Sequence, residues 1–564
     1  MPRCCLLLTV CFIGCLALLS PANDGTAAAD GERIEKLIKQ LGADKFQDRE
    51  EASKALDAIG APALAALRAA EQATDAEVRR RAGELVTAIE GRSRQSLAFA
   101  QTVTQAIEVI QEQFVMEVVP GELTASAVRA LYQQVNQSLP ADLERQLMKA
   151  AKLSAKECSG VLFDARLRLG QRVDLDEQQD CHHSIRGLVQ RLDPNGDYFE
   201  PAAYMAVLVN NLAGIGVLLR EEPTSGRIKV FTPVKDGPAY KAGLRGGDTI
   251  LKIALAEDAS GRPFAQPLVV DGQNLTLQEA SKTLYGQPGS KVEVTVQRSG
   301  APQPVTFVVV RGRVTQESVH GCKRHDDDRW DYWLDPETRL AYIRLSLFAR
   351  DTLPDLRAVL DRLDRDGVRG LVLDLRFNPG GLALQAVDIS DLFIDDGLIV
   401  DVRQRKQGNP YRSDDDGGFL KFPLACLVNG ETRGGAEVMA ACLQDHNRAV
   451  VIGERTAGKS SVQNIIPFRP TSCQFKLTTA VFHRPDGRKL DRLAMPGRDA
   501  DEWGVTPNPG YRLLLPDREQ QVLKEHLERQ GVIGPKGAPP QDTGYADRQL
   551  QRAVEYLQAV LAKR

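Results

Sequence analysis

The chain has 564 residues, a formal net charge of −3, 43% hydrophobic residues and 26% charged residues. This composition is ordinary for a soluble globular protein, and the length suits roughly three to four domains. The near-neutral charge and an aromatic content of 5% argue against nucleic acid as a partner.

The first 29 residues have the pattern of a secretory signal peptide. Arg3 supplies a positive start, an apolar run follows from Cys4 to Leu19, and small residues near Ala22 offer a cleavage site. The run is short for a helix that spans a bilayer. We therefore expect residues 1–29 to be a cleaved signal and the protein to be exported to the periplasm or another extracytoplasmic compartment. A retained membrane anchor is the alternative.

Six cysteines lie beyond this segment, and none forms a C-x-x-C pair. The spacing therefore predicts no metal site, and no motif in the chain indicates a cofactor. Export would permit disulfides, for example between Cys158 and Cys181.

Residues 30–92 show apolar positions at helical spacing, interrupted by Gly60 and Pro62. Paired short helices of this kind resemble a HEAT-like repeat, although only about one and a half repeat units fit. We expect an all-α HEAT-like region that could bind a protein partner, with a plain helical subdomain as the alternative. Residues 93–205 are expected to form a further, mostly helical region.

Residues 206–314 contain a short glycine-rich loop followed by alternating apolar positions typical of strands. The motif G-P-A-Y-K-A-G-L-R-G-G-D-T-I-L-K-I at residues 237–253 accompanies this loop, and residues 254–267 are expected to be an inserted loop. Together these features resemble a PDZ domain, which binds the carboxyl terminus of an extended peptide beside a sheet edge. The resemblance implies a peptide-binding loop at Gly214, Ile215, Gly216 and Val217.

Residues 315–530 contain two strand-and-turn patterns that are typical of catalytic sites. The sequence G-L-V-L-D-L-R-F-N-P-G-G at residues 370–381 predicts an apolar strand and then a turn whose exposed amides can stabilise an oxyanion. Residues 423–463 predict a strand, a sharp turn, a helix, a second strand and a turn that carries Lys459. A strand–turn–helix unit is where α/β enzymes present a nucleophile.

These residues resemble the C-terminal processing peptidases, or tail-specific proteases, which are serine peptidases with a Ser-Lys dyad. The family motifs S-A-S-A-S-E and G-K-x-x-V-Q correspond to T-R-G-G-A-E at residues 432–437 and G-K-S-S-V-Q at residues 458–463. The resemblance implies that Lys459 is the general base, that Gln463 orients its amine, and that the nucleophile position is Gly434. It also implies an oxyanion hole formed by the amide of Gly435 together with that of Gly380 or Gly381.

The fold expected from this resemblance is multidomain α/β: a crotonase-like peptidase core over residues 315–530 with an embedded PDZ domain. Residues 531–564 are expected to form a linker and a C-terminal helix. The implied function is serine-type endopeptidase activity on unfolded or C-terminally tagged proteins.

Glycine has no hydroxyl group, so Gly434 puts the activity of the chain in question. A neighbouring hydroxyl, that of Thr432 or else of Ser460 or Ser461, is one substitute. The alternative function is a catalytically inactive peptide-binding or adaptor protein.

Overall fold

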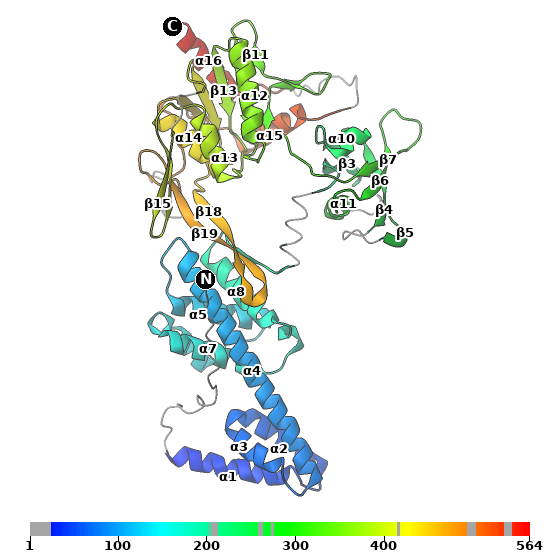
Figure 1. Cartoon of the computed structure of the whole chain (residues 1–564), viewed down its shortest axis with the longest axis vertical. Helices are drawn as coiled ribbons and strands as arrows, with labels where there is room; N and C mark the ends of the chain where they lie inside the picture. Colours follow the sequence, from blue (N-terminus) through cyan, green and yellow to red (C-terminus); the bar gives the residue numbers. More distant parts are fainter. Residues whose placement is uncertain are drawn as a thin grey trace, which may run out of the picture. The chain divides into compact units, whose positions relative to one another are not determined.

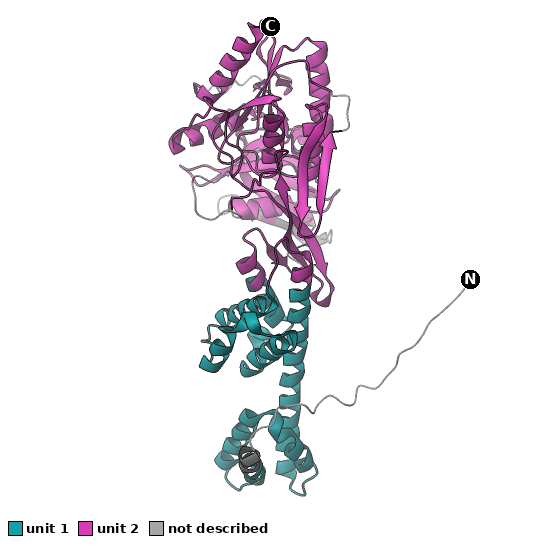
Figure 2. Ribbon diagram, turned by 90° about the vertical axis from the view of Figure 1, so that its left-hand side faces the viewer, with its two compact units in different colours: residues 1–108, 119–187 teal, residues 109–118, 188–564 magenta. Residues whose placement is uncertain are grey.

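The computed structural model describes residues 24–201, 204, 213–257, 263–271, 276–413, 418–492, 503–534 and 544–563. Most of the predicted signal segment lies outside these residues. No helix in the described ranges has the length and apolar character needed to cross a bilayer. The chain divides into two compact units, shown in Figure 2. One comprises Met1–Glu108 and Val119–Gly187, and the other comprises Val109–Val118 and Leu188–Arg564.

The described part of the first unit is helical (Figure 1). The helices of residues 24–192 are α1 (Asp24–Gln40), α2 (Phe46–Ile59), α3 (Leu64–Ala70), α4 (Ala76–Gln113), α5 (Pro120–Gln134), α6 (Ala141–Leu147), α7 (Ala155–Arg168) and α8 (Gln179–Leu192), with short 3-10 helices η1 (Ala61–Ala63), η2 (Ala150–Lys152) and η3 (Val173–Leu175). Apolar side chains of α1 to α4 form one buried cluster, which confirms the helical prediction for residues 30–92.

Two details of this region refine the prediction. Helix α2 ends where predicted, because Gly60 adopts a φ of +71° and donates its amide to the carbonyl of Leu56. Helix α4 runs without a break through residues 92 and 93, where the boundary between two helical regions was expected. Cys158 and Cys181 are both free, buried thiols, so the disulfide considered for them is not formed.

The centre of the second unit is a six-stranded sheet. Four strands run parallel: β12 (Leu340–Leu345), β13 (Gly370–Asp374), β16 (Leu424–Val428) and β17 (Ala449–Gly453). Two strands pair antiparallel with β12: β8 (Val319–His320) and β11 (Trp333–Asp335). Alternate residues of the parallel strands enter two different apolar clusters, as expected for a parallel sheet that is buried on both faces.

Helices cover both faces of this sheet (Figure 1). One apolar cluster includes side chains of α12 (Thr352–Arg365), α13 (Ala383–Asp391) and α14 (Gly435–Asp445). The cluster on the other face includes α16 (Arg548–Leu561), the predicted C-terminal helix. A further helix, α15 (Asp517–Gln530), precedes α16 in the chain.

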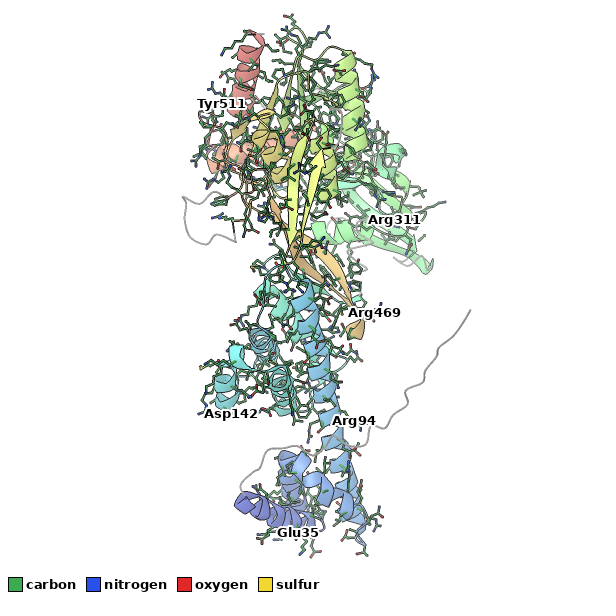
Figure 3. All side chains as sticks on the ribbon, turned by 60° about the vertical axis from the view of Figure 1, so that its left-hand side comes forward. Glu35, Arg94, Asp142, Arg311, Arg469 and Tyr511 are labelled. Carbon is green, nitrogen blue, oxygen red and sulfur yellow. The ribbon has the colours of Figure 1, made fainter. Side chains whose placement is uncertain are left out.

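A second, antiparallel sheet borders the candidate site. Its strands are β1 (Asp197–Phe199), β14 (Gly397–Gln404), β15 (Gly408–Ser413), β18 (Ser461–Phe468) and β19 (Cys473–His483). The 3-10 helix η4 (Arg469–Thr471) joins β18 to β19, and Arg469 is labelled in Figure 3. Two short strands, β9 (Lys323–Arg324) and β10 (Trp330–Asp331), form a separate pair. Because β18 begins two residues after Lys459, this sheet holds one side of the lysine loop.

Residues 213–314 form a β-rich subdomain, which we call the β subdomain. It contains β2 (Val217–Glu221), β3 (Ile228–Pro233), β4 (Thr249–Glu257), β5 (Pro263–Asp271), β6 (Lys291–Gln297), β7 (Val305–Val310), α10 (Pro238–Ala242) and α11 (Leu277–Leu284). The buried Arg311, labelled in Figure 3, donates to the carbonyls of Thr283 and Leu284 and so attaches the end of α11 to the sheet.

The prediction of a loop over residues 254–267 is wrong. Strands β4 and β5 pair antiparallel there, with Ile253 opposite Val270 and Leu255 opposite Leu268. Ile253 and Leu255 are both buried in the core of the β subdomain, so the alternating pattern of β4 continues beyond the point where the strand was expected to end.

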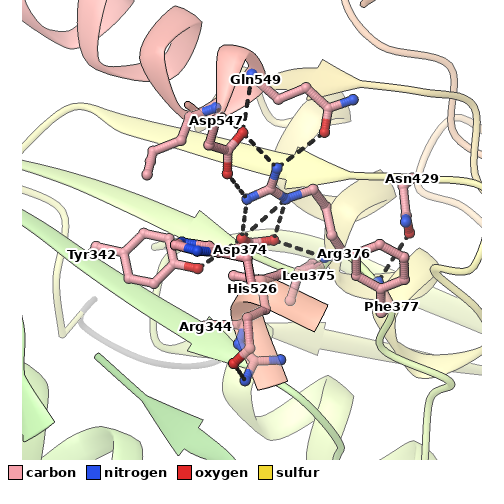
Figure 4. A network of polar contacts seen from close by, with 12 residues as sticks. Tyr342, Arg344, Asp374, Leu375, Arg376, Phe377, Asn429, His526, Asp547 and Gln549 are labelled. Carbon is pink, nitrogen blue, oxygen red and sulfur yellow. Dashed lines mark hydrogen bonds and ion pairs between the residues drawn. The ribbon is translucent and has the colours of Figure 1, made fainter. Parts of the chain in front are cut away.

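A buried ion network joins the end of β13 to the C-terminal helix (Figure 4). The Arg376 guanidinium lies 2.6 Å from the carboxylate of Asp374 and 2.7 Å from that of Asp547, and Arg376 and Asp374 are fully buried. Asp374 also accepts a 2.8 Å hydrogen bond from the hydroxyl of Tyr342. Asp547 caps α16 by accepting from the backbone amides of Gln549 and Leu550. The network therefore explains why an Arg follows the Asp of the L-D-L-R motif.

We expect Asp547→Ala to lower the free energy of unfolding by about 2–4 kcal/mol, because it removes a helix cap and two charge-assisted hydrogen bonds from a buried guanidinium. Glu555→Ala on the same helix is the matched control. It removes a solvent-exposed ion pair with Arg552 and should change stability by less than about 0.5 kcal/mol. Urea denaturation of both variants measures the difference, and equal effects would contradict the network's structural role.

Candidate active site

The turn between β16 and α14 has the backbone of a nucleophile elbow without its side chain. Gly434 has a φ of +57° and a ψ of −119° and lies immediately before the first residue of α14. A Cβ atom placed there would have Gly380 Cα as its nearest neighbour, at 3.8 Å. A side chain at position 434 is thus strained by the positive φ but has space.

The second glycine turn, at residues 378–381, packs directly against this elbow. The Arg433 amide donates to the carbonyl of Asn378 at 2.9 Å. A Cβ at Gly380 would approach the Arg433 carbonyl oxygen to 3.0 Å and the Gly435 nitrogen to 3.3 Å, and a Cβ at Gly381 would lie 2.3 Å from the Phe348 carbonyl oxygen. Glycine is therefore required at position 380 for the two turns to meet and at position 381 for the turn to pack against the backbone of Phe348.

The three amides predicted for the oxyanion hole differ in their availability. The Gly380 amide donates to the side-chain oxygen of Asn378 at 2.8 Å. Among the described residues, the amides of Gly381 and Gly435 have no acceptor. The backbone places Gly380 close to Gly435, but Gly381 rather than Gly380 has the unoccupied donor on this turn.

Glu437 is the residue that ties the elbow to the lysine loop. Its side chain is fully buried. It accepts hydrogen bonds from the amides of Gly434 (3.1 Å), Gly458 (2.7 Å) and Lys459 (2.8 Å) and from the Thr456 hydroxyl (2.5 Å). One carboxylate oxygen, Oε2, thus accepts hydrogen bonds from the backbone amides of both Gly434, the nucleophile position, and Lys459, the predicted base.

Burial shifts the pKa values of both Glu437 and Lys459. It raises the pKa of Glu437 from its usual 4.5 to about 7, although the four hydrogen bonds act in the opposite direction. Burial also lowers the pKa of Lys459 from its usual 10.5, and the positive charges of Lys476 and Arg433 lower it further. A lysine must lose its proton to act as a base, so the direction of this shift suits the predicted role.

Gln463 lies on β18, near the lysine loop. Its amide donates to the hydroxyl of Ser461 at 2.7 Å and to that of Thr478 at 3.3 Å. No hydrogen bond joins it to Lys459 within the described parts of the chain. Its orienting role toward the amine stays a prediction.

Sequence reasoning did not identify Glu437 or Asp193 as site residues. Asp193 is buried and accepts from the amide of Thr478 at 2.7 Å, and its negative charge opposes the lowering of the Lys459 pKa. Glu437 belongs to the quoted motif T-R-G-G-A-E, and Asp193 lies in the sequence L-D-P at residues 192–194. Motif membership was the available signal for Glu437, whereas the partner of Asp193, Thr478, is 285 residues away in sequence.

The structure argues against Thr432 as a substitute nucleophile. Its hydroxyl is fully buried and donates to the carbonyl of Leu375 at 2.9 Å while accepting from the amide of Asn429. These bonds hold the elbow turn and leave the hydroxyl inaccessible to a substrate. Ser460 is also fully buried, and the Ser461 hydroxyl accepts from Gln463.

A groove in the β subdomain contains all four residues of the predicted peptide-binding loop. It is lined by Gly214, Ile215, Gly216 and Val217 together with apolar side chains that include Leu219, Val234, Leu284 and Val314. In the described structure the amides of Ile215 and Gly216 have no acceptor. The groove runs beside β2, which is an edge strand of its sheet.

Comparisons with known proteins agree with this architecture. Residues 339–508 match peptidase family S41. The chain is 32% identical over 380 residues to a carboxy-terminal-processing protease of Bartonella bacilliformis, covering 65% of this chain and 78% of the relative. It is 30% identical over 373 residues to the carboxy-terminal processing protease CtpA of Bacillus subtilis, covering 63% and 72%.

Among solved structures, the photosystem II D1 C-terminal processing protease is 24% identical, with a TM-score of 0.40, covering 79% of this chain and 99% of that structure. The sequence relatives define the class of this protein as a serine peptidase of the C-terminal processing type. The chain belongs to peptidase family S41, among the carboxy-terminal processing proteases.

We expect Glu437→Gln to lower the free energy of unfolding by about 1–3 kcal/mol at pH 5, because the amide nitrogen replaces an acceptor of a backbone N–H. The folded pKa of Glu437 lies above its unfolded value, so the stabilisation from its bound proton is complete below about pH 4.5 and is lost as pH rises through about 7. The stability difference between wild type and variant should therefore narrow over this range. Denaturation at several pH values measures it, and a difference that widens with pH would contradict the assignment.

Proposed function

We propose that this protein is a carboxy-terminal processing peptidase that binds the C-terminal segments of protein substrates and whose hydrolytic step is weakened by Gly434. One observation carries this proposal: the elbow geometry, the buried Glu437 clamp, the free amides and Lys459 are all present around a position that has no hydroxyl. The family supplies the substrate class, namely proteins processed at their C-termini.

The proposed mechanism assigns a task to each retained part. The amides of Gly435 and Gly381 stabilise the negative charge that develops on the carbonyl oxygen of the scissile bond. Neutral Lys459 takes a proton from a water molecule that attacks the carbonyl carbon in place of the missing serine. The Lys459 ammonium then gives this proton to the amine nitrogen of the substrate as the C–N bond breaks, which leaves a new carboxyl terminus and a free amine. Enzymes that lose their nucleophile keep about 10³–10⁴-fold acceleration over water from the oxyanion hole and binding, so slow cleavage is the expected outcome.

We propose that the β subdomain is a PDZ domain over residues 206–314 and that its groove receives the substrate's C-terminal carboxylate. The free amides of Ile215 and Gly216 support this role, as does the edge strand β2, which can pair with an added peptide strand. Further proposals follow from the sequence pattern: the HEAT-like character of residues 30–92, a protein partner for these helices, and export of the chain.

A non-catalytic peptide-binding protein remains the second candidate function, and Gly434 is the observation that favours it. The two functions differ in one measurable respect, which is turnover of a protein substrate. Binding in the groove is common to both.

We expect Gly434→Ser to raise the rate of cleavage of an unfolded protein with an apolar C-terminus by at least about 10²-fold, because it restores a hydroxyl beside an intact base and oxyanion hole. Gly434→Ala is the matched control. Both substitutions carry the positive-φ strain of about 1–2 kcal/mol, but only serine supplies the hydroxyl, so the alanine variant should not gain activity.

Lys459→Ala in the Gly434→Ser background should lower the rate by about 10²–10⁴-fold. The rate of the serine variant should rise with pH through an inflection below the usual lysine range, because the neutral amine is the active form. No gain from Gly434→Ser over Gly434→Ala would favour the non-catalytic function. Wild-type cleavage that is insensitive to Lys459→Ala would contradict the proposed mechanism.

We expect Gly216→Ala to weaken binding of a peptide with a free, apolar C-terminus by at least about tenfold, because the added Cβ would lie 3.2 Å from both methyl groups of Val314 in the groove. Gly226→Ala is the control: its φ of +66° is similar to the +73° of Gly216, but it has only the Glu221 side chain nearby. Calorimetric titration with free and C-terminally amidated peptides measures the effect. Equal affinities of the two variants would place the binding site elsewhere.

A further inference from the structure

Phe377 occupies an unusual backbone conformation between two anchored residues of the site. Its φ is +60°, a region that a bulky L-residue rarely adopts and that costs conformational energy. Arg376 before it is locked in the buried ion network. Asn378 after it donates to the Leu345 carbonyl and accepts from the amides of Arg433 and Gly380. Phe377 therefore links the buried ion network to the turn that carries Gly380 and Gly381.

The backbone and the ring of Phe377 are held by different elements. Its amide donates to the side-chain oxygen of Asn429 in the elbow turn at 2.9 Å, as Figure 4 shows. Its ring packs against the apolar cluster that contains Leu523 and Leu527 of α15. Without these contacts a residue with this side chain would relax to negative φ.

Helix α15 is itself fixed to the elbow. The Lys524 ammonium lies 5.4 Å from the centre of the Phe377 ring and 2.9 Å from the carboxylate of Glu431. Glu431 donates its amide to the same Asn429 side-chain oxygen that accepts from Phe377. The helix, the elbow turn and the glycine turn thus meet around one strained residue.

We propose that Phe377 is a positioning residue that, through its packing on α15, fixes the turn carrying the free amide of Gly381 against the elbow that carries Gly435. This inference rests on the proposed function, in which the amides of Gly381 and Gly435 stabilise the oxyanion. The strain at Phe377 is maintained because the ring gains its contacts with α15 only when the backbone adopts this conformation. Residues that tolerate positive φ, such as asparagine, remove the strain but also remove the attachment to the helix.

The test compares Phe377→Asn, which keeps the favoured φ without the ring, with Phe377→Tyr, which keeps the ring. Hydrogen–deuterium exchange with mass spectrometry reports the turn directly in the full chain, without any need for turnover. We expect Phe377→Asn to increase exchange at residues 378–382 and 430–436 by at least about tenfold and Phe377→Tyr to exchange as the wild type does. Unchanged exchange at both segments in the asparagine variant would overturn the proposal.

Leu523→Ala removes the helix side of the same contact, while Val522→Ala changes an exposed position next to it on α15. The first should increase exchange at residues 378–382 and the second should not. Equal exchange in these two variants would overturn the role of α15.

Kinetics in the Gly434→Ser background separates positioning from general destabilisation. There, Phe377→Asn should lower kcat by about 10- to 100-fold with KM changed less than about twofold, since displaced oxyanion donors act on the transition state. An unchanged kcat would overturn the proposal. If Gly434→Ser has no turnover, the proposed function fails, while the exchange measurements still decide the role of Phe377.

Discussion

The site depends on one buried carboxylate. Glu437 gathers the amides of Gly434, Gly458 and Lys459 on its two oxygens, so the first turn of α14 and the loop after β17 form one rigid unit. Placing a carboxylate in the interior is costly unless donors surround it, and here four donors do. The same residue lies in the first turn of α14, where the helix dipole favours negative charge. The elbow at position 434 is therefore held through its backbone amide and not through a side chain.

The parallel sheet supplies the frame for this arrangement. Strands β13 and β16 are neighbours and both end at the same edge, so the glycine turn and the elbow emerge side by side. Contact between the Asn378 carbonyl and the Arg433 amide then joins them. The buried Arg376 pairs with Asp374 and Asp547, which anchors the end of β13 and recruits the C-terminal helix to the opposite face of the sheet.

The chain belongs to the peptidase family, but Gly434 lacks the hydroxyl group that the chemistry of the family uses. A peptidase site with no remaining function would have no need of three features that this chain has. They are the close approach of Gly380 to Gly435, the free amides, and a lysine whose pKa is lowered by burial. In the proposed mechanism these features polarise a carbonyl group even without a covalent step. The groove beside β2 contains none of them, so the proposed peptide binding and the proposed hydrolysis depend on different parts of the chain.

The sequence by itself determined the helical N-terminal region, the α/β character of the core and the identity of the motifs, because apolar periodicity and glycine-rich turns are local signals. Gly434, Lys459 and the glycines of the second turn could all be named from these motifs. Only the tertiary structure decided which amides are free, that Thr432 is buried, that the carboxylates of Glu437 and Asp193 act on Lys459, and that Phe377 packs against α15. It also showed that residues 254–267 contribute to two paired strands. These facts depend on contacts between different segments of the chain, such as Thr432 with Leu375 and Asp193 with Thr478, and no local pattern encodes them.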